Sequence, residues 1–220
     1  TYCNLETEQT KYFREEFSFE EIKKWFDDLM EEYGKWATFQ CEMKNQRQAS
    51  IKELDFPFEY RPGQKKLVLD VYRTIMRQKL LFMQAPTGVG KTISTIFPAV
   101  KAVGEELADR IFYLTAKTIT TTVAKETFAL LEKNGYRAKT IQITAKEKLC
   151  PCDEMECNPV TCPYAKGHFD RVNDAVFDLL HRCEMIERDD ILSQADRYTV
   201  CPFELCLDTA SWCDNIICDY

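Results

Sequence analysis

The sequence predicts an α/β protein in which a parallel β-sheet is flanked by helices and interrupted by a mainly helical, cysteine-rich insertion. Three features predict this class. Short apolar runs at residues 80–84, 111–114 and 140–144 alternate with stretches of helical periodicity, a pattern typical of parallel sheets. A glycine-rich loop directly follows the first run. Four cysteines then lie within thirteen residues, from Cys150 to Cys162.

The composition is that of an ordinary globular protein. The 220 residues are 45% hydrophobic and 30% charged, enough for one full domain with additions. The net charge of −7 argues against a uniformly basic nucleic-acid binder but is compatible with a local basic groove. Because no apolar stretch could cross a bilayer and no signal-peptide pattern is present, we expect a cytoplasmic protein without a membrane partner. We further expect a monomer whose two ends are cuts within a longer polypeptide.

Residues 1–50 are expected to form an extension before the main domain, starting with a short strand-like piece. Ser18 and Glu21 have the spacing of a capping box, which predicts a helix start. A helix whose apolar face packs into a core is then predicted from side chains at helical spacing: Ile22, Trp25, Phe26, Leu29, Met30, Tyr33 and Trp36. The polar stretch at residues 42–50 is interpreted as the helix tail or a linker, and as the first domain boundary.

The main domain is expected over residues 51–145, with a return at residues 199–220 after an insertion at residues 146–198. Hydrophobic periodicity predicts the elements in each part. In chain order these are helix 65–77, buried strand 80–84, a helix after the glycine-rich loop, buried strand 111–114, helix 118–131, strand 140–144, helix 174–181, a polar connection at 187–196, and strand 216–218.

The loop from Ala85 to Thr92 predicts a nucleotide site. Glycines let the backbone curl so that its N–H groups face phosphate oxygens, and Gly88 and Gly90 supply that freedom. Lys91 is expected to hold the terminal phosphates, while the Thr92 hydroxyl coordinates Mg²⁺. Pro86, Thr87 and Val89 complete the loop. We therefore expect ATP with Mg²⁺ as the cofactor.

A second nucleotide-binding element lies upstream of the loop. Phe56-Pro57 and Arg61 precede Gln64, about twenty residues before the loop. A side-chain amide can donate to adenine N7 and accept from the exocyclic amine. Arg61 and Gln64 are therefore added to the expected nucleotide site, with a solvated residue at a helix start as the alternative for Gln64.

The cysteine cluster predicts a metal site. Eleven cysteines beside a phosphate-binding loop indicate metal binding or redox chemistry rather than disulfides. The spacing of Cys150, Cys152, Cys157 and Cys162 lacks the paired knuckles usual for zinc, and a proline after the last cysteine is common at iron–sulfur sites. Spacing alone favours iron–sulfur and leaves zinc and free thiols open. The remaining cysteines are Cys183, Cys201 and Cys206, held as reserve ligands with Cys201 favoured as structural, and Cys3, Cys41, Cys213 and Cys218, interpreted as buried small hydrophobes.

The combination resembles the DinG branch of the XPD/DinG helicases over about residues 50–220. The resemblance is carried by the loop, the Phe-Pro…Gln segment, Lys148-Leu-Cys150, Cys162-Pro-Tyr-Ala-Lys-Gly-His-Phe-Asp-Arg171, and Val200-Cys-Pro-Phe-Glu204. It implies a RecA-like domain and unwinding of DNA with 5′-to-3′ polarity, with single-stranded and duplex DNA as partners. It also implies a four-iron cluster (4Fe-4S) held in the insertion by Cys150, Cys152, Cys157 and Cys162.

A DNA contact is expected just after the second predicted strand. Thr115, Lys117 and Thr118 occupy the position of helicase motif Ia, and hydroxyls, a lysine and a helix start are groups that hold a phosphate backbone. Charges and aromatics also alternate around the cysteines, which suits base stacking with phosphate attraction, although a solvated face explains them equally. These residues are Lys146, Lys148, Tyr164, Lys166, Phe169 and Arg171. His168 is interpreted as a packing or DNA-proximal residue.

Two parts of a helicase are missing from the sequence. It contains no Asp-Glu-Ala-His motif and no second motor domain, so we expect the chain alone not to turn over ATP. A nuclease domain before Thr1 is a further hypothesis, without a nuclease signature here to support it. Two alternatives to a helicase stay open: a zinc-stabilised nucleic-acid-binding module, and another kind of P-loop NTPase.

Overall fold

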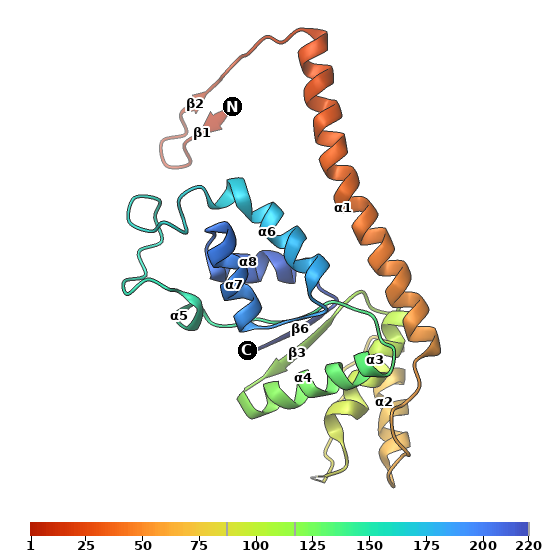
Figure 1. The fold of residues 1–220 in the computed structure, drawn as a ribbon. Coiled ribbons are helices and arrows are strands. Elements are labelled where there is room, and N and C mark those ends of the chain that lie inside the picture. Colours follow the sequence, from red (N-terminus) through yellow and green to blue (C-terminus); the bar gives the residue numbers. More distant parts are fainter. Residues whose placement is uncertain (87, 117, 220) are drawn as a thin grey trace. The chain divides into compact units, whose positions relative to one another are not determined.

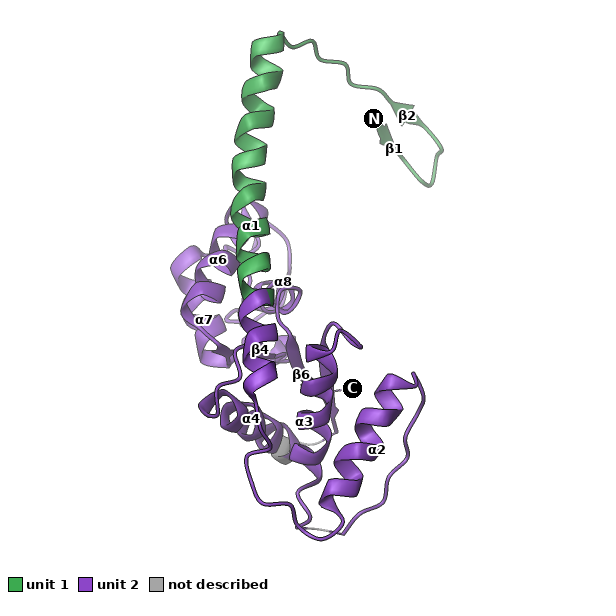
Figure 2. Cartoon of the chain, turned by 90° about the vertical axis from the view of Figure 1, so that its right-hand side faces the viewer, with its two compact units in different colours: residues 1–44 green, residues 45–220 purple. Residues whose placement is uncertain are grey.

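The computed structural model describes residues 1–86, 88–116 and 118–219. The chain divides into two compact units, Thr1–Lys44 and Asn45–Tyr220, which Figure 2 colours separately. The division falls within helix α1, Phe19–Glu53. The polar stretch at residues 42–50 is therefore helix and not an irregular linker.

The first unit opens with a small hairpin. Strands β1, Tyr2–Cys3, and β2, Thr10–Lys11, pair in antiparallel fashion. The predicted capping box at the start of α1 is confirmed. The Glu21 backbone N–H donates to Ser18 Oγ at 3.2 Å, and the Ser18 N–H donates to Glu21 Oε2 at 2.7 Å. Two backbone N–H groups at the helix start, which have no carbonyl partner within the helix, thus receive a hydrogen-bond acceptor.

The predicted packing of the α1 apolar face is wrong. Between 45% and 64% of each of six side chains is exposed, namely Ile22, Trp25, Phe26, Leu29, Met30 and Tyr33. Helical periodicity identifies which side chains share a face, but it does not reveal whether an element packs against that face.

A four-stranded parallel sheet forms the centre of the second unit (Figure 1). Its strands are β3, Ile111–Thr115; β4, Thr140–Gln142; β5, Met185–Ile186; and β6, Asn215–Asp219, in the order β3-β6-β4-β5. Helix α4, Thr118–Lys133, contacts β3 and β6, and α2, Gln64–Met76, packs on α3, Lys91–Gly104. This confirms the α/β class with a parallel sheet, an arrangement compatible with a RecA-like fold.

The strand predicted at residues 80–84 does not form. The segment is irregular, and Leu80 and Phe82 are 87% and 92% exposed. Apolar character alone does not make a strand, because its backbone N–H and C=O groups need a neighbouring strand to pair with. Among the described strands, β3 pairs with β6 along one edge only. Residues 80–84 do not pair with its other edge. The β3 prediction is right in position, but alternate side chains, Phe112 and Leu114, are exposed rather than buried.

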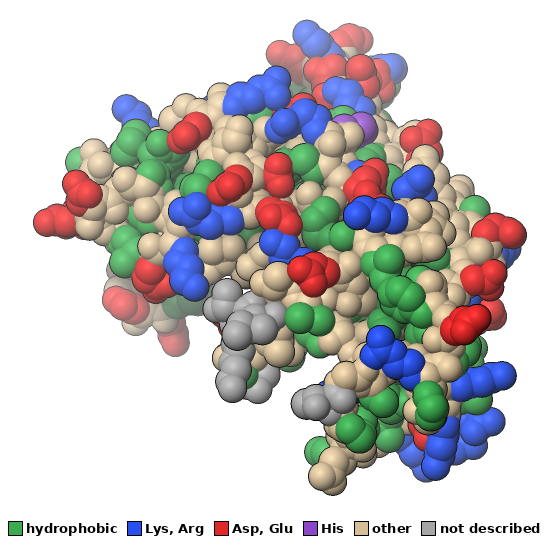
Figure 3. All heavy atoms as spheres, turned by 60° about the horizontal axis from the view of Figure 1, so that its bottom comes forward, with side chains coloured by type: hydrophobic (Ala, Val, Ile, Leu, Met, Phe, Trp, Pro, Cys, Tyr) green, Lys and Arg blue, Asp and Glu red, His purple; other side chains and the backbone are tan. Residues whose placement is uncertain are grey.

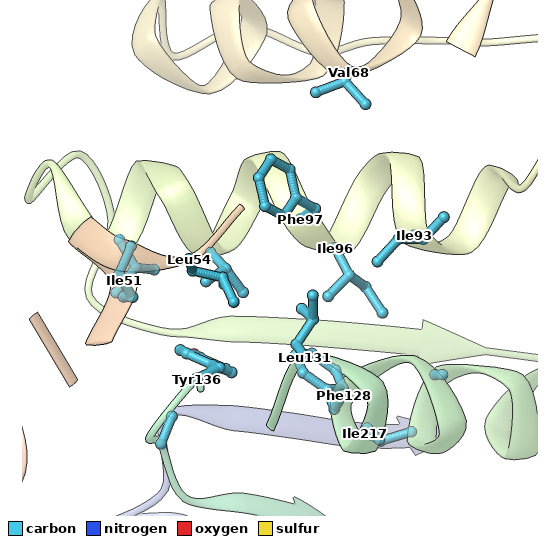
Figure 4. Packing of buried hydrophobic residues seen from close by; sticks show 14 residues of the cluster. Ile51, Leu54, Val68, Ile93, Ile96, Phe97, Phe128, Leu131, Tyr136 and Ile217 are labelled. Atoms are coloured by element: carbon cyan, nitrogen blue, oxygen red, sulfur yellow. The ribbon is translucent and has the colours of Figure 1, made fainter. Parts of the chain in front are cut away.

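The core of the second unit lies between the helices and the sheet (Figure 4). Ile51 lies near the end of α1 and Leu54 just after it, α3 contributes Ile96 and Phe97, and β6 contributes Ile217. A Cβ built on Gly104, at the end of α3, would lie 2.4 Å from Ile51 Cγ2. Glycine at this position therefore permits the close approach of α1 and α3.

The chain between β4 and β6 is mainly helical, as predicted. It contains α5, Lys146–Leu149; α6, His168–Arg182; α7, Arg188–Tyr198; and α8, Pro202–Ala210. The polar connection predicted at 187–196 is wrong, because this stretch is α7. Its start is capped by Glu187 and Asp190, and its Ile191 and Gln194 are buried. Gln194 Nε2 donates to the Ala175 carbonyl at 2.7 Å, so α7 is fixed to α6.

Candidate functional site

The glycine-rich loop leads directly into α3, which begins at Lys91. Gly88 and Gly90 have φ angles of +82° and +78°, in the left-handed region that favours glycine. A Cβ on Gly90 would also lie 2.7 Å from the side-chain nitrogen of Gln64. Two independent constraints therefore favour glycine at position 90: the positive φ angle and the closeness of the Gln64 side chain. Thr87, predicted as part of this site, lies outside the described residues.

Two cationic side chains are bound to the loop backbone. Lys91 Nζ donates to the carbonyls of Ala85 and Pro86, at 3.1 Å and 2.9 Å. The Arg61 guanidinium donates to the carbonyl of Gly88. Positive charge is thus concentrated where the loop and the first turn of α3 present backbone N–H groups, an arrangement suited to binding phosphate.

Gln64 is held against the loop. It is 3% exposed, and its Oε1 accepts the backbone N–H of Arg61 at 3.0 Å. The structure therefore brings Arg61, Gln64 and Gly90 together, as the sequence predicts. The Gln64 side-chain oxygen is already used by the protein, and its nitrogen lies beside the loop.

A cavity of about 530 Å³ opens at the loop. Its size falls in the range of small-molecule and cofactor sites. It is lined by residues of α4 and by Phe58, Arg61, Gly88, Gly90, Lys91, Thr92 and Ile93. The loop, its two cations and an exposed aromatic ring, Phe58, thus border one space.

The predicted DNA-contact residues are only partly described. Thr115 ends β3 and is 3% exposed. Its hydroxyl lies 2.9 Å from Thr121 Oγ1 and donates to Asp219 Oδ1 at 3.1 Å, so it joins β3 to α4 and β6. Thr118 begins α4, whereas Lys117 lies outside the described residues.

Two residues expected near DNA differ in their surroundings. Arg171 donates to the backbone carbonyls of Lys166, Tyr198 and Thr199 at 2.6–2.8 Å, so its guanidinium has a structural role. Phe169 is 87% exposed. Figure 3 shows basic side chains gathered at one margin of the face it presents, while acidic and basic side chains are interspersed over the rest.

Four cysteines line one small cavity of about 30 Å³. Its cysteine lining consists of Cys150, Cys157, Cys162 and Cys201. Cys152 does not line it, but its Sγ lies 4.0 Å from Cys162 Sγ. Cys201, favoured above as structural, therefore joins three of the four predicted ligands. A sequence signal for it exists, since Cys162-Pro-Tyr and Cys201-Pro-Phe repeat the same Cys-Pro-aromatic pattern.

The surroundings of these thiols affect their charge. Partial burial and the neighbouring Cys162 raise the pKa of Cys152 to about 11. Burial also raises the pKa of Cys201. Lys146 lines the same cavity, and its hydrogen bond to the Cys157 thiol raises the pKa of the ammonium. Among the residues that the structure describes, no three metal-ligating side chains are close enough together to hold a metal ion.

His168 fixes the backbone of one cavity cysteine. The imidazole is 4% exposed, which agrees with a packing residue, and its Nδ1 accepts the Cys201 N–H at 3.2 Å. Of the cysteines expected to be buried, Cys213 is buried and Cys218 is half-buried, while Cys3 and Cys41 are exposed, contrary to expectation. The two exposed thiols lie in the first unit, in β1 and α1.

The parallel sheet and the glycine-rich loop at the start of α3 define an α/β protein in which such a loop leads into a helix. A segment of 51 residues, 23% of this chain, is 43% identical to a protein of Methanocaldococcus jannaschii described as a probable ATP-dependent helicase. The match spans 8% of that protein's length. No protein-family profile matches the chain. The partial similarity supports a helicase-like relationship. Within the described ranges, no helix has both the length and the apolar character needed to cross a membrane.

Proposed function

We propose that this chain is the nucleotide-binding part of an ATP-dependent DNA helicase of the DinG/XPD type, with 5′-to-3′ polarity. The observation that carries the proposal is the placement of Lys91, Arg61 and Gln64 around the glycine loop at the start of α3. The partial similarity to a probable helicase supports the same class. Other P-loop NTPases share the loop, but the upstream Arg61 and Gln64 favour a helicase.

In this proposal the loop binds ATP through groups that already surround it. Lys91 exchanges its contacts with the Ala85 and Pro86 carbonyls for the terminal phosphates, and the Thr92 hydroxyl holds Mg²⁺. Arg61 lines the cavity and would face the base, while Gln64 supports Arg61 from beside the loop. Phe58 borders the same cavity and offers an exposed ring against which a base can stack.

Unwinding tests the motor assignment. In a full-length protein that carries both motor domains, unwinding of a duplex with a 5′ single-stranded tail is expected to be lost in Lys91→Ala and kept in Lys65→Ala, which removes an exposed lysine of α2. Unwinding that persists in Lys91→Ala would show that the loop does not drive the motor.

For the insertion we propose a four-iron cluster held by cysteine thiolates. Thiolates are the ligands that iron–sulfur clusters take, and four thiols border one cavity whose other lining residues include Tyr164 and Phe203, which supports the proposal. Cys150, Cys157 and Cys162 are common to the sequence spacing and the cavity, and the fourth ligand is Cys201 or Cys152. With Cys201 as a ligand, the cluster would fasten the start of α8 to the loop that connects α5 and α6.

Metal content tests this proposal. Anaerobically purified protein is expected to be brown, with iron and sulfide near stoichiometry and little zinc. A colourless, zinc-loaded preparation would instead favour the zinc-stabilised nucleic-acid-binding module. The iron content of Cys201→Ser and Cys152→Ser identifies the fourth ligand, because the variant that lacks this ligand is expected to lose iron. Cys41→Ser, which removes an exposed thiol of α1, serves as the control.

A further inference from the structure

A second polar cavity lies at the carboxyl ends of β4 and β6, away from the glycine loop. Its volume is about 130 Å³, and its polar lining includes Thr121, Thr144, Lys148, Arg188 and Asp219. In parallel α/β sheets, ligands bind preferentially beyond the carboxyl ends of the strands. The cavity joins the sheet to the helical insertion, since Arg188 begins α7 and Lys148 belongs to α5.

Thr144 points to a ligand for this cavity. The residue is 7% exposed, and its hydroxyl has no hydrogen-bond partner within the part of the chain that the structure describes. Leaving a buried hydroxyl unpaired destabilises a protein. A bound group with acceptor oxygens would satisfy it.

The charged side chains that line the cavity favour an anionic ligand. Arg188 donates through Nε and Nη2 to the Lys148 carbonyl, at 3.1 Å and 2.9 Å, which holds the guanidinium at the cavity. Its Nη1 lies 3.4 Å from the exposed carboxylate of Asp189. Lys148 is itself exposed and also lines the cavity. The described part of the lining contains only one carboxylate, that of Asp219, which already accepts a hydrogen bond from the Thr115 hydroxyl.

We propose that this cavity binds a backbone phosphate of single-stranded DNA, with Lys148 and Arg188 as the cations and Thr144 as a hydroxyl donor. The inference rests on the proposed helicase function and adds a DNA subsite that joins the sheet to the insertion. A phosphate diester offers acceptor oxygens and a single negative charge, which matches a hydroxyl donor and a net positive lining. The subsite shares no lining residue with the cavity at the glycine loop, although α4 contributes different residues to each.

The salt dependence of DNA binding tests the cations. The affinity of the chain for a fluorescein-labelled oligothymidylate is measured by anisotropy over a range of salt concentrations, without nucleotide. Loss of one phosphate contact is expected to reduce the slope of log K against log salt by about 0.7. Lys148→Gln is expected to weaken binding and to show this reduction. Lys133→Gln, the same charge change at the exposed end of α4, is expected to keep the wild-type slope.

Thr144→Val separates a binding role from a structural one. Removing an unpaired buried hydroxyl while keeping the side-chain shape is expected to leave the melting temperature unchanged or higher, yet to weaken oligothymidylate binding. A lower melting temperature with unchanged binding would overturn the assignment of Thr144.

The other possible results distinguish a failure of the proposed subsite from a failure of the proposed helicase function. If wild-type protein binds oligothymidylate and Lys148→Gln behaves like Lys133→Gln, the subsite is wrong and the helicase proposal stands. If wild-type protein does not bind oligothymidylate, both fail. Inorganic phosphate that protects the protein against melting through Lys148, without a change in DNA binding, would assign the cavity to a free anion and overturn the DNA assignment.

Discussion

The Arg47 guanidinium, near the end of α1, forms an ion pair with the Asp214 carboxylate just before β6. Both side chains are largely buried, at 11% and 16% exposure. Asp214 Oδ2 also accepts the Lys139 backbone N–H at 2.9 Å, and Arg47 donates to the Asp109 carbonyl at 3.3 Å. A single carboxylate therefore ties the entry of β4, the entry of β6 and the end of α1 together at the amino-terminal edge of the sheet.

Breaking this pair should destabilise the second unit. Arg47→Met leaves a buried carboxylate without its cation, which costs about 3 kcal/mol in the free energy of unfolding. Urea unfolding followed by circular dichroism measures the change. The double variant Arg47→Met with Asp214→Asn removes the uncompensated charge and should recover part of the loss. A single variant as stable as the wild type would show that the pair does not contribute.

The Gly90 backbone provides a second test. Gly90→Ala forces an alanine to a φ of +78° and places its Cβ against Gln64. Strain of this kind costs about 1–3 kcal/mol. We expect lower stability and weaker ATP binding, measured by calorimetry. The control is Gly34→Ala in α1, where a Cβ meets nothing within 4 Å. Equal effects of the two substitutions would contradict the proposed packing of Gln64 under the loop.

Stability in acid should depend on Asp178. Its carboxylate accepts Gln194 Nε2 at 3.0 Å and pairs with Arg182 and Arg197, and these contacts lower its pKa below the ordinary value of 3.8. A folded-state pKa below the unfolded one stabilises the protein above the unfolded value, and this contribution is lost as the pH falls through the folded value.

Asp178→Asn should therefore lower the melting temperature at pH 7 and reduce the difference from wild type below about pH 4. Asp174→Asn, at an exposed position of the same helix, is the matched control. A deficit of Asp178→Asn that is the same at pH 3 and pH 7 would show that the ionised form is not what stabilises the insertion.

The elements predictable from sequence are those whose local pattern determines them. The capping box at Ser18 and Glu21 and the loop at Gly88 and Gly90 depend on residues close together in the chain. The wrong predictions depend on distant partners. Residues 80–84 have the composition of a strand but no strand beside them, and the polar stretch of α7 becomes a helix because Gln194 reaches α6.

The cysteine site shows the same limit. Local spacing places Cys150, Cys152, Cys157 and Cys162 in one group. Cys201 joins the cavity because α6 and α7 return the chain to it, and His168 fixes its backbone N–H. Only the repeated Cys-Pro-aromatic pattern links Cys162 to Cys201 in the sequence. The unpaired Thr144 hydroxyl could not be predicted from the sequence, because only the fold shows that it is buried without a hydrogen-bond partner among the described residues.

Thermal melting with and without ATP and Mg²⁺ tests whether the glycine loop binds ATP through Lys91. At a ligand concentration about 100 times the dissociation constant, binding adds about 2.7 kcal/mol to the free energy of unfolding. ATP is expected to raise the melting temperature of the wild type and of Lys65→Ala, but not that of Lys91→Ala. An equal rise in Lys91→Ala, or no rise in the wild type, would contradict this expectation.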